Sequence, residues 1–262
     1  MIIDFCAFIG SWPTYPVSGD PEVVQNSLSN YGVSQILVSP LESAWCRNPH
    51  RCNHLVYRAA ETLADIWPVP ILDPTIATWQ SALHQAQAFV PELYPQKRVH
   101  LVRLLPAYSP YDLSQADELL KSLVEAKLGV IIQTRLEDPR RQHPLAQVPD
   151  LPAEEVAAVA EQYPALKIII GGIRTGEIRN LRRQLLDRPN LYADVSQVDG
   201  LNVIKVLVND GLVDKLLFGS HTPIFTPHAA IARVVCDLDD GTPNATAAIS
   251  KIFSGNASRI LD

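Results

Sequence analysis

Three arginines stand at or just beyond the carboxyl ends of short apolar runs of the kind that form buried strands: Arg103, Arg135 and Arg174. Gln133 precedes Arg135 by two residues, so both side chains can point inward from one strand. A guanidinium group binds a carboxylate or a phosphate through two parallel hydrogen bonds. The sequence therefore predicts a site for a small anionic molecule, with these four residues as candidate contacts. An alternative is that nearby carboxylates neutralise the arginines in structural ion pairs, with Glu137, Asp138 and Asp194 as the partners.

A second cluster holds two thiols and two imidazoles within nine residues: Cys46, His50, Cys52 and His54. Thiolate and imidazole groups are the ligands that zinc prefers, so the segment is a candidate for a relocated metal site. The spacing matches no known finger or ribbon. A proline and an asparagine that can cap a helix explain the segment equally well as the loop after a second strand.

Eight short apolar runs alternate with longer amphipathic stretches along the whole chain. The runs expected to be strands are Ile2–Cys6, Gln35–Ser39, Val69–Asp73, His100–Leu105, Gly129–Thr134, Leu166–Gly171, Leu191–Val195 and Lys215–Gly219. Helices are expected at, among others, Pro21–Tyr31, Asn53–Trp67, Gln80–Phe89, Ser114–Lys127, Ala153–Tyr163 and Gly200–Asp210. The runs are almost continuously apolar, as in parallel strands covered by helices. This order predicts an α/β fold, a closed (β/α)₈ TIM barrel, as one domain over residues 1–262. An open doubly wound sheet is the alternative, but no glycine-rich phosphate loop follows the first run.

The composition limits the classes of partner. The chain is 47% hydrophobic and 19% charged, with a net charge of -6 and no long basic run, so we expect no nucleic-acid partner. No apolar run is long enough to span a membrane, and the amino-terminal stretch, which contains Asp4, does not resemble a signal peptide. Four cysteines are too few for a disulfide scaffold. We therefore expect a cytoplasmic protein with a small-molecule ligand; a homo-oligomer stays open.

Several motifs carry a family resemblance. Residues 216–223 read Leu-Leu-Phe-Gly-Ser-His-Thr-Pro, and residues 252–260 read Ile-Phe-Ser-Gly-Asn-Ala-Ser-Arg-Ile. These segments resemble the last strand and the closing helix of amidohydrolase-2-type barrels. Residues 2–4, 71–74 and 102–106 are similar to the first, third and fourth strands of that family, so the resemblance covers nearly the whole chain in the right order.

The resemblance implies a divalent metal, commonly zinc, that activates a water molecule for hydrolysis. The family holds this ion through histidines of the first, fifth and sixth strands and an aspartate of the eighth. The corresponding residues here are Cys6, Phe8, Gln133, Gly172 and His221, so no family ligand is retained. We therefore expect neither the usual metal nor another cofactor.

Two of the substituted positions keep side chains that could act in catalysis. Cys6 and His221 belong to the first and last strands, which are neighbours in a closed barrel. His221 could take the proton of the thiol, leaving a thiolate that attacks a carbonyl group, and Asp194 could orient the imidazole. The alternatives are that Cys6 simply fills space, or that Cys6, His221 and a third group hold a metal.

Two functions remain in competition at this point. In the first, an amidohydrolase-related barrel hydrolyses a small acidic molecule without a metal, with Gln133 and the arginines polarising a carbonyl group and His221 as general base. The family resemblance extends to relatives that hydrolyse lactones without metal. In the second, a catalytically silent barrel acts as a ligand-binding or assembly protein. The loss of every family ligand favours the second, and the polar residues at the strand ends favour the first.

Overall fold

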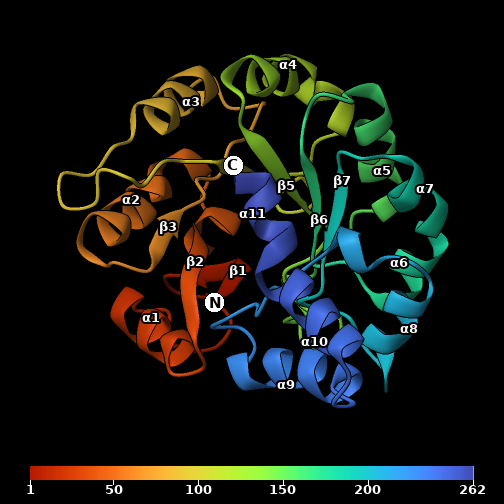
Figure 1. Cartoon of the computed structure of the whole chain (residues 1–262). Helices are drawn as coiled ribbons and strands as arrows, with labels where there is room; N and C mark the ends of the chain where they lie inside the picture. Colours follow the sequence, from red (N-terminus) through yellow and green to blue (C-terminus); the bar gives the residue numbers. More distant parts are fainter. Residues whose placement is uncertain (262) are drawn as a thin grey trace.

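Parallel strands surround a common axis, and helices cover them on the outside (Figure 1). The computed structural model describes residues 1–261. The strands in these residues are β1 (Ile2–Ile9), β2 (Val33–Pro40), β3 (Ile66–Pro68), β4 (Leu101–Leu104), β5 (Gly129–Gln133), β6 (Ile168–Gly171), β7 (Leu191–Asp194) and β8 (Leu216–Leu217). They form two parallel sheets, one with the order β1-β2-β3 and one running from β4 to β8.

Backbone hydrogen bonds close these two sheets into a ring. At one junction the Phe5 amide donates to the Phe218 carbonyl over 2.9 Å, which joins β1 to the end of β8. At the other, the Arg103 amide of β4 donates to the Pro70 carbonyl over 2.9 Å. The expected TIM barrel is therefore confirmed, while its description as one domain over residues 1–262 stays a prediction.

Most of the helices connect successive strands and form the outer layer; the last three follow β8, and the final one closes one end of the barrel. The helices are α1 (Pro21–Ser29), α2 (Asn53–Thr62), α3 (Trp79–Ala88), α4 (Asp117–Ala126), α5 (Ala153–Gln162), α6 (Thr175–Asn180), α7 (Arg182–Asp187), α8 (Val203–Asn209), α9 (Pro227–Leu238), α10 (Pro243–Ser250) and α11 (Asn256–Leu261). Local chemistry sets several starts: Asp20 accepts from two amides of the first turn of α1, and Pro21 follows it. No helix within residues 1–261 is long and apolar enough to cross a membrane.

The third strand departs from the sequence expectation. We expected Val69–Asp73, whereas β3 is Ile66–Pro68 and pairs with β2. After β3 the chain moves from β2 to β4. The Val69 amide still donates to β2, whereas Ile71 forms an isolated bridge with Arg103 of β4. Proline at positions 68 and 70 cannot donate to a ladder, so continuous pairing is broken where the apolar run is strongest.

A β-bulge after Asp4 decides which side chains of β1 point into the barrel. Ile3 and Phe5 pack into an apolar layer inside the barrel, which α11 closes at the amino ends of the strands. The bulge, between Asp4 and Ala7, breaks this alternation, so that Cys6 and Phe8 belong to a second apolar cluster near the carboxyl ends of the strands. Asp4 spans the bulge by accepting a hydrogen bond from the Cys6 amide over 3.0 Å. The bulge therefore aims Cys6 and Phe8 at the place where the strands end.

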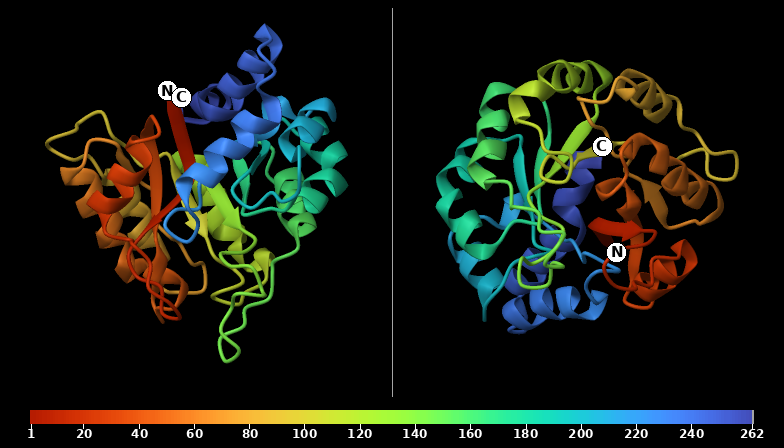
Figure 2. Two further views of the ribbon diagram at one scale, coloured as in Figure 1. Left: turned by 90° about the horizontal axis from the view of Figure 1, so that it is seen from below. Right: turned by 180° about the vertical axis from the view of Figure 1, so that it is seen from behind.

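The two ends of the barrel differ in form. Both termini lie at one end, and the loop between β5 and α5, green in Figure 2, extends from the other. That second end carries the loops that follow the strands, and in TIM barrels it is the end that binds ligands.

Candidate functional site at the carboxyl ends of the strands

The side chain of Arg103 lies inside the barrel and is fully buried. Its Nε donates to the Ser39 hydroxyl over 3.0 Å, and its Nη2 donates to the Phe5 carbonyl over 3.2 Å. Nη1 donates to the side-chain oxygen of Gln133. The guanidinium carbon also lies 4.7 Å from the centre of the Phe8 ring, in a cation–π contact. Arg103 therefore binds the barrel itself rather than facing a ligand.

This guanidinium lies where the family resemblance places a metal. The implied ligand positions are occupied by Cys6, Phe8, Gln133, Gly172 and His221. Arg103 is bonded to Gln133, stacked on Phe8, and has its Nη1 3.8 Å from the Cys6 sulfur. Phe8 and Gly172 offer no side-chain donor, and residues 1–261 contain no group of three or more His, Cys, Asp or Glu placed to hold a metal. The residues present do not fit a divalent ion here.

Gln133 and two glycines of β6 and its loop form a matched set. The side-chain nitrogen of Gln133 donates to the Arg135 carbonyl over 2.7 Å. A Cβ on Gly171 would come within 2.5 Å of the Gln133 side-chain oxygen, and a Cβ on Gly172 within 2.6 Å of the Arg135 carbonyl. Gly172 also has a φ of +69°, a backbone conformation that residues with a side chain rarely adopt. The strand-six position is therefore closed to a histidine by its neighbours.

His221 is fully buried beside the axis. Its Nε2 lies 2.7 Å from the Leu136 carbonyl, which assigns the ring proton to Nε2, and Nδ1 faces the Cys6 sulfur at 3.3 Å. Burial lowers the pKa of His221 to about 3, with the positive charge of Arg103 acting in the same direction. The imidazole is therefore neutral at ordinary pH.

Cys6 contacts His221 as the sequence predicted, but its thiol is neutral. The thiol is fully buried, and burial raises its pKa far above the usual range, with the charge of Asp194 adding to the effect. A neutral thiol donates to the free Nδ1 of His221. The structure thus brings the two residues together, and the directions of both pKa shifts keep the proton on sulfur; the nucleophilic role of Cys6 stays a prediction.

Asp194 does not contact His221 directly. Its Oδ2 accepts from the Gly172 amide over 2.9 Å, and its Oδ1 accepts from the Ser196 amide over 2.9 Å and the Ser196 hydroxyl over 2.5 Å. The Ser196 oxygen in turn lies 3.5 Å from His221 Nδ1. We expected Asp194 to contact the His221 imidazole directly, but Ser196 lies between them.

Arg135 is held by carboxylates. Its Nη1 and Nη2 bind Glu177 at 2.8 and 2.5 Å, and its Nε lies 2.8 Å from Asp150. The side chain is only 2% exposed. Its donors are therefore engaged, and the ion pairs have other partners than the expected Glu137, Asp138 and Asp194.

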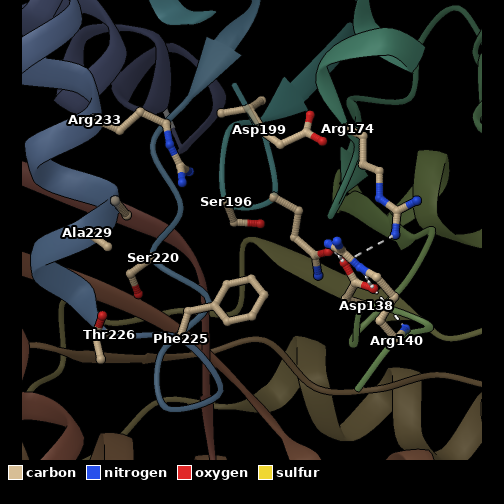
Figure 3. A pocket seen from close by; sticks show the side chains of 13 residues that line it. Asp138, Arg140, Arg174, Ser196, Asp199, Ser220, Phe225, Thr226, Ala229 and Arg233 are labelled. Carbon is tan, nitrogen blue, oxygen red and sulfur yellow. Dashed lines mark hydrogen bonds and ion pairs between the residues drawn. The ribbon is translucent and has the colours of Figure 1, made fainter. Parts of the chain in front are cut away.

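A hollow of about 260 Å³ opens beside helix α9, at the carboxyl ends of β6, β7 and β8 (Figure 3). Ser196, Gln197 and Ser220, which follow β7 and β8, are buried residues that form its floor, and Phe225 contributes an apolar wall. Two larger hollows, each of about 340 Å³, lie elsewhere: one at the opposite end of the barrel, beside Gly129 and Lys167, and one on the outer surface, beside Glu22 and Arg58. TIM barrels do not place ligands at either location. The hollow beside α9, which we call the arginine pocket, is the candidate ligand site.

Two arginines face the arginine pocket from opposite sides, Arg174 after β6 and Arg233 on α9 (Figure 3). The Arg174 guanidinium forms long ion pairs with Asp150 at 3.8 Å and with Asp138, one of the expected partners, at 4.0 Å. Both distances are beyond hydrogen-bond range. Arg233 has no hydrogen bond or ion pair with any other residue of the part of the chain described, 1–261. Both arginines therefore have donors available for a ligand.

The rim of the arginine pocket carries further charges. Arg140 binds Asp138 through its Nε and Nη2 at 2.9 and 2.6 Å, and its side chain is 89% exposed. Asp199 lines the opposite side and is exposed. With Arg174 and Arg233, three arginines face two aspartates, which leaves a local excess of positive charge in a protein of net charge -6.

The thiol and imidazole cluster after β2 divides into separate contacts. Cys46 and Cys52 have their sulfur atoms 3.1 Å apart. His50 instead accepts from the Asp73 amide over 2.9 Å, and His54 Nδ1 lies 2.7 Å from a backbone carbonyl of its own loop. The two histidines therefore do not join the thiols as metal ligands.

Three residues of the arginine pocket were not predicted from the sequence: Ser196, Ser220 and Arg233. The two serines follow strand runs by one or two residues, a spacing that could have marked them, and Ser220 stands within the motif at residues 216–223. Arg233 gives no such signal, because an arginine on an amphipathic helix has the pattern of a solvent-facing residue.

Solved structures with the same fold were found across the whole chain. An uncharacterized TIM-barrel protein from Bordetella bronchiseptica has 19% identity and a TM-score of 0.64, covering 92% of this chain and 82% of its own. A probable 2-pyrone-4,6-dicarboxylic acid hydrolase from Acinetobacter baumannii, with citric acid bound, has 14% identity and a TM-score of 0.66, covering 99% and 98%. A 4-oxalomesaconate hydratase from Rhodopseudomonas palustris has 16% identity and a TM-score of 0.65, covering 100% and 95%.

No curated protein matched the chain. The amidohydrolase family model, in contrast, matches residues 67–262, which is most of the chain and includes the strands that end at the arginine pocket. The motifs at the last strand and the closing helix lie within the matched range. The chain therefore belongs to the amidohydrolase family that the sequence motifs indicated.

Proposed function

We propose that the protein binds a small molecule with two or more carboxylate groups in the arginine pocket. The observation that carries this proposal is the pair Arg174 and Arg233, which face each other across the hollow. Each guanidinium can bind one carboxylate through two parallel hydrogen bonds. The Ser196 and Ser220 hydroxyls below them can fix the orientation of the ligand between the two charges.

The size and charge of the hollow agree with such a ligand. A volume of about 260 Å³ lies below the range typical of drug-sized ligands, so a compact molecule is favoured. Arg174 retains donors because its carboxylate neighbours lie at 3.8 Å or more. Two of the structurally similar proteins are named for, or hold, carboxylated small molecules, which supports this ligand class.

A second candidate function, metal-independent hydrolysis of the bound molecule, is favoured by one further observation. The Ser196 hydroxyl borders the hollow and donates to Asp194 over 2.5 Å. A carboxylate in this position can take the proton as the hydroxyl oxygen attacks a carbonyl carbon. His221, the predicted general base, is buried behind this group, with its Nδ1 3.5 Å from the Ser196 hydroxyl oxygen. The family membership supports a hydrolytic reaction class.

Citrate is a suitable probe for the binding proposal, because it carries three carboxylates on a compact frame. We expect isothermal titration calorimetry to detect binding to the wild-type protein. Arg174→Met and Arg233→Met should each weaken it by about 10-fold or more, since a charge-assisted hydrogen bond contributes roughly 1.5–3 kcal/mol. Arg183→Met is the matched control, because that side chain is 90% exposed and lies outside the hollow.

Equal affinity for citrate in the wild-type protein and both pocket variants would overturn the binding proposal. For hydrolysis, carboxylated lactones, esters and amides are followed by proton NMR. Turnover that disappears in Ser196→Ala, while citrate still binds to the two arginines, would support the hydrolase. Ligand binding without turnover of any of these compounds would identify the barrel as a binding protein.

A further inference from the structure

The loop after β2 brings two thiols face to face, away from the arginine pocket. The sulfur atoms of Cys46 and Cys52 are 3.1 Å apart, and both cysteines are free. This separation is shorter than ordinary contact between non-bonded carbon atoms, about 3.5–4.0 Å. The two sulfur atoms therefore point directly at each other, and a bond between them needs only a small movement.

The hydrogen bonds of the loop itself set this approach. Two short 3₁₀ turns, Leu41–Ala44 and Pro49–Cys52, flank the exposed Cys46. The Ser43 hydroxyl of the first turn donates to the Pro49 carbonyl of the second over 2.9 Å, and Asn48 caps the second turn. The pair is therefore held together by the fold of the loop rather than by one side-chain rotamer.

The two thiols differ in access to solvent. Cys46 is exposed, whereas Cys52 is buried, with 8% of its surface exposed. The Cys52 thiol donates its proton toward the Cys46 sulfur. Burial raises the pKa of Cys52 to about 12, with its contact to Cys46 adding to the effect. Cys46 is thus the sulfur that meets an oxidant first, and Cys52 is the resolving thiol.

We propose that Cys46 and Cys52 are a redox modification site that forms a reversible disulfide, with a peroxide as the oxidant. The Cys46 thiol loses its proton and its sulfur attacks the peroxide, an S–O bond forms as the O–O bond breaks, and the leaving hydroxide takes that proton and departs as water. The Cys52 sulfur then attacks the Cys46 sulfur, the S–S bond forms, and the S–O bond breaks. The departing hydroxide takes the Cys52 proton. Two thiols are oxidised and one peroxide is reduced to two waters.

The residues next to the two cysteines pack against other parts of the barrel, so a disulfide here would link two segments that are already held in place. Trp45, next to Cys46, packs its ring 5.7 Å from the rings of Trp12 and of Tyr108. Asn53, next to Cys52, exchanges two hydrogen bonds of 2.8 Å with the backbone of Ile71. The disulfide joins these two anchors, so we expect oxidation to raise the Tm by roughly 2–5 °C. None of the residues lining the arginine pocket belongs to this loop, so citrate binding should not change.

Mass spectrometry of the full-length chain tests the proposal directly. The Cys236→Ser variant is used throughout, because that third thiol is exposed and could join two molecules. After treatment with hydrogen peroxide we expect the loss of two hydrogen atoms, reversed by dithiothreitol. Trypsin cleaves after Arg47, Arg51 and Arg58, so the disulfide should link residues 1–47 to residues 52–58.

The Cys46→Ser variant decides the assignment, because residues 1–47 contain both Cys6 and Cys46. The link should vanish in this variant, whose altered side chain is exposed and should leave folding unchanged. A link that persists would overturn the proposal, as would the gain of two or three oxygen atoms on Cys46 with Cys52 still free. About one zinc ion per purified chain, lost in Cys46→Ser, would also overturn it, because the thiols would then be metal ligands.

Discussion

Two polar regions lie near each other at the carboxyl ends of the strands, and they use their charges in opposite ways. On the barrel axis, Arg103, Gln133, His221 and Cys6 are buried and bind one another or the backbone. In the arginine pocket, the donors of Arg174 and Arg233 face a hollow between the strand ends and α9. The axis has the polar groups of a site but no room for a ligand. The arginine pocket has the room.

This difference teaches that polar residues at strand ends do not locate a site by themselves. What separates the two regions is whether each hydrogen-bonding group already has a partner within the protein. A fully paired buried network holds elements of the fold in place, because a buried polar group left unpaired costs about 1–3 kcal/mol. An arginine beside a hollow whose guanidinium makes no hydrogen bond within the protein has binding capacity left for a ligand.

The largest expected effect comes from an attempt to restore a family ligand on the axis with Gly172→His. Gly172 has a φ of +69°, and a Cβ at this position would lie 2.6 Å from the Arg135 carbonyl oxygen, so any side chain here is unfavourable. We expect the free energy of unfolding to fall by roughly 3–5 kcal/mol, from backbone strain and overpacking together. Urea unfolding measures the loss, and elemental analysis should find no zinc gained.

Gly176→His is the matched control for this substitution. Gly176 lies in α6, and a Cβ there would meet no atom within 4 Å. A change within about 0.5 kcal/mol is expected, as for an ordinary surface substitution. If Gly172→His were as stable as Gly176→His and gained one zinc ion, the axis would be an adaptable metal site and the comparison of the two regions would fail.

The next effect is a pH dependence that belongs to the axis alone. Asp4 is fully buried, and burial raises its pKa to about 6 from 3.8. The folded protein therefore holds a proton that the unfolded chain releases, and the resulting stability is complete below about pH 4 and is lost as the pH rises through 6. The shift corresponds to about 3 kcal/mol.

Asp4→Asn should remove this dependence. The remaining side-chain oxygen can still accept from the amides of Cys6 and Ser220, as Oδ1 of Asp4 does at 3.0 Å. Relative to wild type, the variant should gain about 3 kcal/mol between pH 4 and pH 7.5 in urea unfolding. Comparing the two proteins cancels the opposite effect of His221, whose pKa near 3 removes stability as the pH falls. Parallel pH profiles would show that Asp4 does not hold a proton in the fold.

Much of the fold follows from sequence periodicity, and much of the site does not. Apolar runs placed seven of the strands close to where they lie, and the motifs at residues 216–223 and 252–260 indicated the family. The predicted position of the third strand was wrong, because two prolines move the pairing with β2 toward earlier residues. The inward turn of Cys6 and Phe8 depends on the bulge after Asp4, which a local sequence pattern does not reveal.

The roles of the three predicted arginines were not separable from the sequence. Arg103 lies in β4 and is enclosed, Arg135 follows β5 and is bound by two carboxylates, and Arg174 follows β6 and reaches the arginine pocket. The partners that make the difference, Asp150 and Glu177, are far along the chain from Arg135. Only the folded arrangement shows which guanidinium groups are already occupied.

Exchanging arginine for lysine should separate two of these roles, with the smallest effects of the series. Lysine keeps the charge but cannot form the paired hydrogen bonds that join Arg135 to Glu177. Arg135→Lys should therefore lower the free energy of unfolding by about 2 kcal/mol, whereas Arg174→Lys should change it by less than about 0.5 kcal/mol. Calorimetry with citrate should give the reverse order, with several-fold weaker binding in Arg174→Lys and little change in Arg135→Lys. If both variants lost stability and affinity alike, the two arginines would belong to one network, and the boundary between the axis and the arginine pocket would have to be drawn elsewhere.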